Sequence, residues 1–292
     1  YNSTSGTFKS TLISAAWVSG ANANVQAYNL GGAGSQTAAL TMGGANATGV
    51  ASLASTEEYN GSGWSVAEDL PAATSYTAGC GTQTAAILAG GNLIPSYSST
   101  TSREYDGTNW AAGNPLNTAT GTTGQIIGIL SAALITGGDR VPASPRSIAN
   151  VSEYDGTNWT AVTALPAVRQ DQGTAGTQTA GLVFSGMADT HPGTSNTIYN
   201  TTLEYNGASW TSGGNVPVSI RSQGGSGTQT DAFSMGGNPN TTPTSVTSVF
   251  NYDGTSWTAN PASLGVARQR MAYSSSTPSA TAFVAKGGAP GG

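Results

Sequence analysis

The sequence has few charged side chains and, in particular, few basic ones. Its 292 residues include 9 Lys or Arg and 14 Asp or Glu, which leaves a net charge of −5 and a charged fraction of 8%. An ordinary soluble domain carries about 25% charged residues. Nucleic-acid binding requires a positively charged surface that neutralises phosphates, and nine basic residues in an acidic chain do not supply one. We therefore expect no nucleic-acid partner.

Metal-binding side chains are equally scarce. The chain has one histidine, His191, and one cysteine, Cys80. Zinc and copper sites need several such ligands, so we expect no metal and no cofactor. A lone cysteine forms no internal disulfide. Cys80 lies among small residues, where a buried, unreactive side chain is expected.

Long apolar runs and strong helix formers are also missing. The most apolar stretch runs from Gln125 to Ile135 and is interrupted by Gly and Ser, whereas a membrane span needs roughly 20 apolar residues. We expect no membrane insertion. Glu, Lys, Leu and Arg are scarce while 41 Gly and many Thr are present, which disfavours helices. The chain is predicted to be all-β. It starts at Tyr1 without a signal-peptide pattern, so we expect a processed chain or a piece of a longer one.

Tryptophan recurs with a regular period. Five of the six tryptophans end the same phrase, in which a Tyr precedes the Trp by five residues across Asn-Gly or Asp-Gly, as in Glu104-Tyr105-Asp106-Gly107-Thr108-Asn109-Trp110. These dipeptides favour tight hairpin turns, so each phrase predicts strand, turn, strand. The six tryptophans, spaced by 46 to 51 residues, are Trp17, Trp64, Trp110, Trp159, Trp210 and Trp257.

Two other landmarks complete the repeat. A Gly-Thr-Gln-Thr phrase, such as Gly81-Thr82-Gln83-Thr84, precedes an apolar run that ends at a glycine pair, such as Gly90-Gly91. Each unit of about 48 residues therefore contains four short strands. Six such sheets packed around an axis bury the faces that one sheet leaves exposed, which predicts a six-bladed β-propeller. We expect residues 1–292 to form this single domain.

The chain ends predict how the ring closes. The last glycine pair, Gly287-Gly288, comes two strands into a unit, and the segment around Trp17 lacks the Tyr phrase. We expect the last blade to take its outer strands from residues before about Ala21, so that strands from both termini remove the free sheet edges. An alternative treats Tyr1-Asn2 and Phe8 as the degenerate phrase.

The order of these landmarks resembles the kelch repeat. An apolar strand, Gly-Gly, a variable loop, Tyr-(Asp/Asn)-Gly and Trp are followed by Leu165-Pro166-Ala167-Val168-Arg169. The resemblance implies a kelch-like propeller in which the glycine pairs let blades approach closely and Tyr and Trp lie between blades. The phrase Glu-Tyr-Asp-Gly-Thr-Asn-Trp-Thr is also similar to repeat-rich proteins of marine bacteriophages, thought to be virion appendage or tail (tail-fibre) proteins. That similarity implies a virion-surface or extracellular location, with other virion proteins or a host-surface glycan or receptor as partners.

The loops at the two ends of the strands are predicted to form two different faces of the propeller disc. The Asp-Gly and Gly-Thr-Gln-Thr turns share one face, which we call the turn face. The loops after the glycine pairs and after the tryptophans share the other, the variable face, where length and sequence differ most between units. We expect ligand binding there, through aromatic or charged residues that break the repeat: Tyr97, Arg140, Arg146, Asp189, His191 and Tyr199.

Polar residues that recur in each unit are expected to be structural. The Asp or Asn of the turn phrase is replaced freely, which fits turn formation. The Glu before the Tyr, as in Glu104, is expected to accept a hydrogen bond between blades. A third recurring set consists of arginines: Arg169, Arg221 and Arg268. The kelch resemblance implies a structural role for them, which we predict. The alternative is a sialidase-like propeller, which uses three such arginines to bind a carboxylate.

Two classes of function remain open. The first is a non-enzymatic phage virion appendage or adhesion module that recognises a host-surface glycan or protein, or that docks to other virion proteins. The second is a glycan-active hydrolase or lyase, sialidase-like, on the same scaffold. A glycosidase needs two carboxylates about 5 to 9.5 Å apart, and the non-repeated acids are scattered over the units. We favour the first class and assign no catalytic residue.

Overall fold

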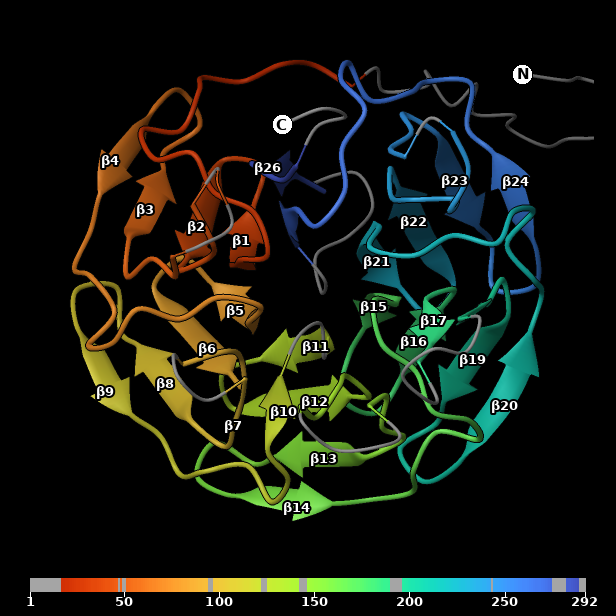
Figure 1. The fold of residues 1–292 in the computed structure, drawn as a ribbon, viewed down its shortest axis with the longest axis horizontal. Helices are drawn as coiled ribbons and strands as arrows, with labels where there is room; N and C mark the ends of the chain where they lie inside the picture. Colours follow the sequence, from red (N-terminus) through yellow and green to blue (C-terminus); the bar gives the residue numbers. More distant parts are fainter. Residues whose placement is uncertain are drawn as a thin grey trace, which may run out of the picture.

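The computed structural model describes residues 17–46, 48, 51–93, 97–121, 125–141, 146–189, 196–242, 244–274 and 282–288. In these ranges the regular elements are strands and there is no helix, hence none that is long and apolar enough to cross a membrane. Five four-stranded antiparallel sheets radiate from one axis (Figure 1). The described residues form an all-β propeller with five four-stranded blades.

Each blade runs outward from the axis in chain order. Blade 1 contains β1 Gly31–Ser35, β2 Ala38–Met42, β3 Thr56–Tyr59 and β4 Trp64–Val66. Blade 2 contains β5 Ala78–Thr82, β6 Ala85–Ala89, β8 Ser102–Tyr105 and β9 Trp110–Ala112. Blade 3 contains β11 Gln125–Ile129, β12 Ala132–Thr136, β13 Val151–Tyr154 and β14 Trp159–Ala161. Blade 4 contains β15 Gly173–Gly176, β16 Gly181–Phe184, β19 Thr202–Tyr205 and β20 Trp210–Gly213. Blade 5 contains β21 Gly224–Thr228, β22 Asp231–Met235, β23 Val249–Tyr252 and β24 Trp257–Ala259.

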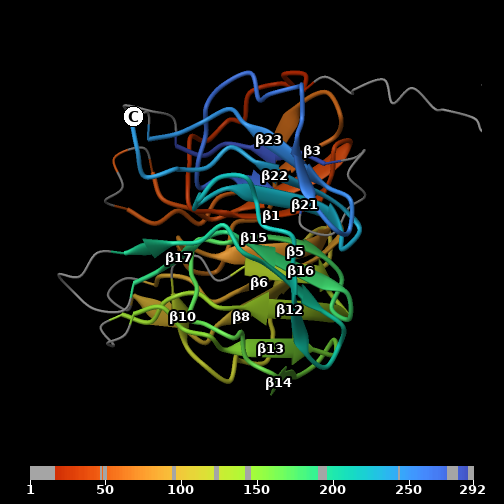
Figure 2. The same ribbon diagram turned by 90° about the vertical axis from the view of Figure 1, so that its right-hand side faces the viewer.

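Three two-stranded sheets accompany the blades. Two lie on the variable face and pair β7 Ser98–Ser99 with β10 Thr120–Gly121 and β17 Met187–Ala188 with β18 Thr197–Ile198. Figure 2 shows β10 and β17 projecting on the same side of the disc. The third pairs β25 Ala272–Tyr273 with β26 Val284–Ala285, and we call it the C-terminal hairpin. Its β25 contacts β1 of blade 1 and β21 of blade 5 (Figure 1).

We predicted six four-stranded blades, with the ring closed by strands from both termini. The described residues do not form this arrangement. They form five complete blades and the two-stranded hairpin. Tyr1, Asn2 and Phe8, and the predicted closing strands before residue 17, lie outside the described residues.

The last glycine pair is one residue earlier than predicted. Gly287 N donates to Ala27 O at 3.0 Å, as Gly91 N donates to Thr120 O at 2.9 Å in blade 2. Lys286 therefore occupies the first position of the pair and adopts the same positive φ, 58°. A lysine thus replaces the glycine that the sequence pattern placed there.

The predicted turns join the third and fourth strands of each blade. Asp106 Oδ1 accepts hydrogen bonds from Thr108 N at 2.8 Å and Asn109 N at 2.7 Å, and these bonds lower the pKa of Asp106 below its usual value. The same turn recurs at Asn60, Asp155, Asn206 and Asp253. The structural role predicted for these residues is confirmed.

The repeated Glu and Tyr connect neighbouring blades. Tyr105 Oη donates to Glu58 Oε1 of the preceding blade at 2.9 Å, and Tyr205 Oη donates to Glu153 Oε1 at 3.0 Å. The pairs Tyr154–Glu104 and Tyr252–Glu204 repeat the contact. The predicted interblade role of the glutamates is confirmed. Each Tyr ring also packs against the Trp of its own hairpin, with centroids 4.8 to 5.1 Å apart.

The glutamine of the repeated Gly-Thr-Gln-Thr phrase also connects neighbouring blades. Gln83 Nε2 donates to Ala39 O at 3.0 Å and to Tyr59 O at 2.8 Å, both in the preceding blade. Gln178 and Gln229 make the equivalent pairs of bonds. The glutamine thus satisfies carbonyl groups on two strands of the neighbouring sheet.

Small residues allow the inner strands to converge. A Cβ added to Gly32 of β1 would lie 2.7 Å from Tyr273 N of the C-terminal hairpin, and one added to Gly90 would lie 2.7 Å from Thr120 O of the next unit. The close approach that the kelch resemblance implied for the glycine pairs is present. Cys80 is buried, and burial raises the pKa of its thiol, as expected for an unreactive core residue.

Candidate functional site

Loops of blades 2, 3 and 4 form one hydrogen-bonded cluster on the variable face. We call it the loop ridge; it comprises residues 97–99, 139–141, 146–147 and 187–189. Ser98 Oγ donates to Val141 O at 3.1 Å and accepts a bond from Val141 N at 3.0 Å, which joins the loops of blades 2 and 3. Asp189 N donates to Ser147 Oγ at 2.7 Å and joins blade 4 to them.

An arginine holds the centre of the loop ridge. Arg146 Nη2 lies 3.3 Å from Asp139 Oδ2, and its Nη1 lies 3.5 Å from Asp189 Oδ2. The Asp139 side chain is 1% exposed and that of Asp189 13%, whereas that of Arg146 is 40% exposed. The two carboxylates are therefore anchors, and the guanidinium is the group that reaches the surface.

Of the residues predicted to bind a ligand, Tyr97, Arg140 and Arg146 reach the surface of the loop ridge, and Tyr199 is turned inward. Tyr97 is 58% exposed, and Arg140 is exposed beside Arg146. Tyr199 is half-buried and lies under Arg169, whose guanidinium carbon is 4.6 Å from the ring centroid. His191 lies outside the described residues.

The three arginines of the predicted central set do not share a position. The β-bridges place Arg221 in register with Gln170 and Gln269, one residue after the position shared by Arg169 and Arg268. Arg169 Nη1 donates to Ser185 O at 2.8 Å, and Arg268 Nη1 donates to Lys286 O at 3.0 Å. Both acceptors stand where other units have the first glycine of the pair. Burial lowers the pKa of Arg169 to about 10.

The axis carries a set of residues that sequence reasoning missed. In the described part of the chain, the residue two positions before the inner strand has a positive φ in four blades and in the C-terminal hairpin. We call these residues the axial ring. They are Asn29, Tyr76, Asp171, Ser222 and Arg270, with φ between 53° and 57°. In the sequence they are marked only by their position: each lies two residues before an inner strand, and the residue type differs from unit to unit.

Backbone hydrogen bonds connect the axial ring around the axis. Tyr76 N donates to Asn29 O at 2.7 Å, and Asn29 N donates to Arg270 O at 3.0 Å. Arg270 N donates to Ser222 O at 2.9 Å, and Ser222 N to Asp171 O at 2.8 Å. The ring thereby fixes five different side chains at the centre of the variable face.

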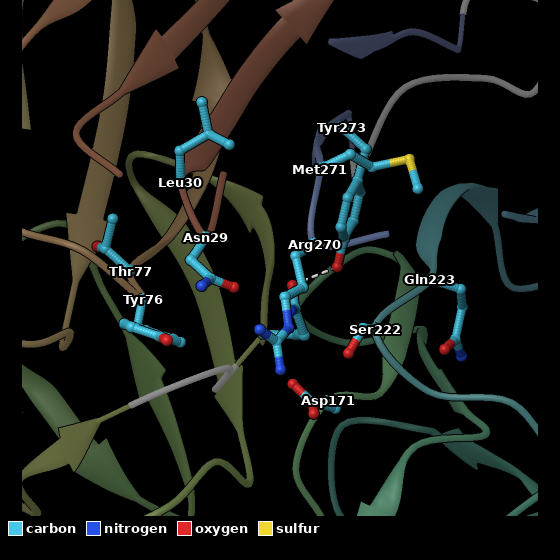
Figure 3. Close-up of a pocket in the computed structure, with 11 residues that line it drawn as sticks. Asn29, Leu30, Tyr76, Thr77, Asp171, Ser222, Gln223, Arg270, Met271 and Tyr273 are labelled. Carbon is cyan, nitrogen blue, oxygen red and sulfur yellow. Dashed lines mark hydrogen bonds between the residues drawn. The ribbon is translucent and has the colours of Figure 1, made fainter. Parts of the chain in front are cut away.

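These side chains line a small pocket on the axis (Figure 3). Asp171 forms an ion pair with Arg221, whose Nη1 is 3.6 Å from Asp171 Oδ2. Burial raises the pKa of Tyr76 against the opposing effect of the Arg270 charge. Tyr273, labelled in Figure 3, also lines the pocket, and its Oη donates to Gln125 Oε1. The pocket therefore presents an amide, a hydroxyl, a phenol and charges of both signs.

The described residues hold no group of three or more His, Cys, Asp or Glu side chains that is arranged to bind a metal. Their polar groups at the ridge and in the axial pocket instead suit hydrogen bonding and charge pairing with a ligand. No protein-family model matches the sequence, and no curated protein matches it.

Proposed function

We propose that this propeller is a non-enzymatic binding module of a phage virion, with a kelch-like architecture, that recognises a host-surface glycan or protein through its variable face. The observation that carries the proposal is the loop ridge, where loops from three blades are joined by side chains and leave Tyr97, Arg140 and Arg146 exposed. Rigid loops that present aromatic and arginine side chains are typical of recognition surfaces.

The distribution of charge supports the choice of face. Arg140, Arg146, Arg221 and Arg270 lie on the variable face with three acids, Asp139, Asp171 and Asp189. Asp106 and Asp155 lie in the exposed turns of the opposite face. In a chain of net charge −5, this separation makes the variable face the more positive one. An acidic ligand is therefore attracted to the ridge side of the disc.

The alternative, a sialidase-like hydrolase or lyase, has weaker support. Asp139 and Asp189 are two carboxylates that lie close to one arginine, and both already bind the guanidinium of Arg146. A glycosidase requires one member of its pair to donate a proton to the leaving group. Two acids engaged by the same arginine are better suited to anchoring a loop than to proton transfer.

The experiment is binding of the labelled chain to a glycan array and to host cells. The double variant Arg140→Gln and Arg146→Gln is expected to weaken binding at least tenfold. Asp106→Asn is the matched control on the turn face, because Asn60 and Asn206 form the same turn. Loss of binding in Asp106→Asn with retention in the double variant would place the site on the turn face. Release of new reducing ends from a bound glycan would favour the hydrolase.

The same proposal includes a sixth blade completed by the N-terminal segment. The ring of Trp17 packs 6.1 Å from that of Phe233 in blade 5, and Trp64 Nε1 of blade 1 donates to Ala21 O at 3.1 Å. The segment around Ala21 thus passes outside the C-terminal hairpin, from blade 5 to blade 1. Deletion of residues 1–20 is expected to lower the melting temperature, and an unchanged melting temperature would contradict closure.

A further inference from the structure

We propose that the axial pocket binds the carboxylate of an acidic sugar unit at the end of a glycan. This inference rests on the proposed function, since it names the chemistry that the variable face recognises. It starts from three neighbours on the axial ring, Ser222, Arg270 and Asn29, which successive backbone hydrogen bonds of 2.9 and 3.0 Å hold side by side. Figure 3 shows their side chains around the same space.

Each of these neighbours has a buried polar atom without a hydrogen-bond partner among the described residues. They are both amide atoms of Asn29, the Ser222 hydroxyl and Arg270 Nε. Asn29 is 5% exposed and Ser222 6% exposed. Leaving a buried polar group unpaired is costly, so several such groups at one pocket indicate that something polar satisfies them.

The available atoms fit a carboxylate with neighbouring hydroxyls. Arg270 Nε, Asn29 Nδ2 and the Ser222 hydroxyl donate, and a carboxylate accepts from several donors at once. Asn29 Oδ1 is left as an acceptor for a sugar hydroxyl. Asp171 is paired with Arg221 at 3.6 Å, so the two arginines and one aspartate leave a net positive charge beside the pocket.

The shape of the pocket limits the ligand to an end group. The hydrogen bond from Tyr273 Oη to Gln125 Oε1 joins two of the residues that line the pocket. Tyr273 is 8% exposed and lines the pocket with Gln125. The pocket is small, so it admits a group that projects from the end of a chain, such as a carboxylate, and excludes the interior of the chain.

The test measures binding of glucuronate, glucose and acetate to the whole chain by calorimetry or ligand-observed NMR. We expect glucuronate to bind at least tenfold more tightly than glucose or acetate, and more weakly as salt is raised. Arg270→Gln is expected to lower the affinity for glucuronate by about 10- to 100-fold, the effect of losing a charge-assisted hydrogen bond. Asn29→Asp, which keeps a residue that tolerates positive φ, is expected to do the same by charge repulsion. Asp106→Asn, in a turn of the opposite face, is the control that retains binding.

The outcomes separate this inference from the proposed function. Glucose or acetate binding as tightly as glucuronate would overturn the acidic-sugar assignment, as would unchanged affinity in folded Arg270→Gln and Asn29→Asp. If glucuronate fails to bind while the ridge variants still lose attachment to cells, the axial site is wrong and the binding module stands. If the chain attaches to no glycan or cell, the proposed function fails as well.

Discussion

The joints between complete blades and the joint between the C-terminal hairpin and blade 1 are built differently. At the former, a tyrosine hydroxyl donates to a glutamate of the preceding blade, as Tyr205 does to Glu153 at 3.0 Å. At the latter, Lys286 Nζ lies 2.5 Å from Glu57 Oε2, with side chains only 3% and 0% exposed. Asn24 N also donates to Glu57 Oε1 at 2.8 Å. The joint between complete blades recurs and pairs a neutral tyrosine with a glutamate. The joint between the hairpin and blade 1 is a buried ion pair between Lys286 and Glu57.

The difference follows from what each joint holds. A complete blade buries four strands, so the Tyr–Glu contact only adds to extensive apolar packing. The C-terminal hairpin has two strands of two residues each and buries less. A buried ion pair adds little net stability, but separating its partners is costly, so it favours one docking position over all others. We infer that Lys286 and Glu57 fix where the hairpin docks, and that the aromatic residues supply stability elsewhere.

The largest expected effect is on a complete joint. Trp159 is 5% exposed and packs 4.8 Å from the Tyr154 ring, between centroids. Trp159→Ala is expected to lower the free energy of unfolding by about 3 to 5 kcal/mol, measured by urea denaturation. Trp64→Ala, at a half-buried site, is the control and should cost less. A larger loss in Arg169→Ala than in Trp159→Ala would contradict the role given to the tryptophan.

A somewhat smaller effect is expected at the hairpin. Breaking a buried ion pair costs about 3 to 5 kcal/mol when one charge is left uncompensated. Lys286→Met leaves Glu57 its bonds from Asn24 N at 2.8 Å and Val25 N at 3.3 Å, so we expect a loss of roughly 2 to 3 kcal/mol. The double variant with Glu57→Gln is expected to recover most of it. A double variant no more stable than Lys286→Met would show that the charge of Glu57 is not what the lysine compensates.

The contrast also shows which parts of the structure the sequence made predictable. Strands, turns and the roles of Glu104 and Asp106 were predictable because they recur, and repetition identifies positions that packing constrains. The position of Lys286 was not predictable, because the repeated glycine pair in the sequence favoured Gly287-Gly288 as the last pair. The register that places a lysine there depends on the bond from Gly287 N to Ala27 O, between opposite ends of the chain.

The candidate site was predictable only in part, for a similar reason. Tyr97, Arg140 and Arg146 stand out as departures from the repeat, and the structure leaves them exposed on one ridge. The residues of the axial ring, such as Asn29 and Arg270, lie far apart in the sequence and become neighbours only through the circular arrangement of the blades. No local pattern marks a contact of that kind.

The two kinds of joint are expected to weaken at opposite ends of the pH range. Burial alone would raise the pKa of Glu57, but the hydrogen bond and charge of Lys286 and the Asn24 N–H outweigh it and leave the pKa below its usual value. Its contribution is present above the ordinary glutamate pKa of about 4.3 and is lost as pH falls through the lower folded value. Thermal melts should show less acid destabilisation in the Glu57→Gln, Lys286→Met double variant. Equal acid sensitivity would exclude this pair as a cause.

The smallest expected effect is at a single repeated hydrogen bond. Burial and the Glu153 carboxylate raise the pKa of Tyr205 to about 12, so the folded state keeps the phenol proton more tightly than the unfolded chain. Its contribution is present below the ordinary tyrosine pKa of about 10 and is lost as pH rises toward 12. Tyr205→Phe is expected to cost about 1 kcal/mol at neutral pH and to reduce the alkaline loss.

Tyr105→Phe tests whether the joints are equivalent, because Tyr105 makes the same contact with Glu58 at 2.9 Å. If the joints between blades are equivalent, the two substitutions should lower the free energy of unfolding by the same amount within about 0.5 kcal/mol. Their effects should add in the double variant, because the sites are far apart. Urea denaturation of the two single variants and the double variant measures both quantities. Unequal costs, or costs that fail to add, would mean that the ring transmits strain between blades and that a Tyr–Glu contact is no more local than the Lys286–Glu57 pair.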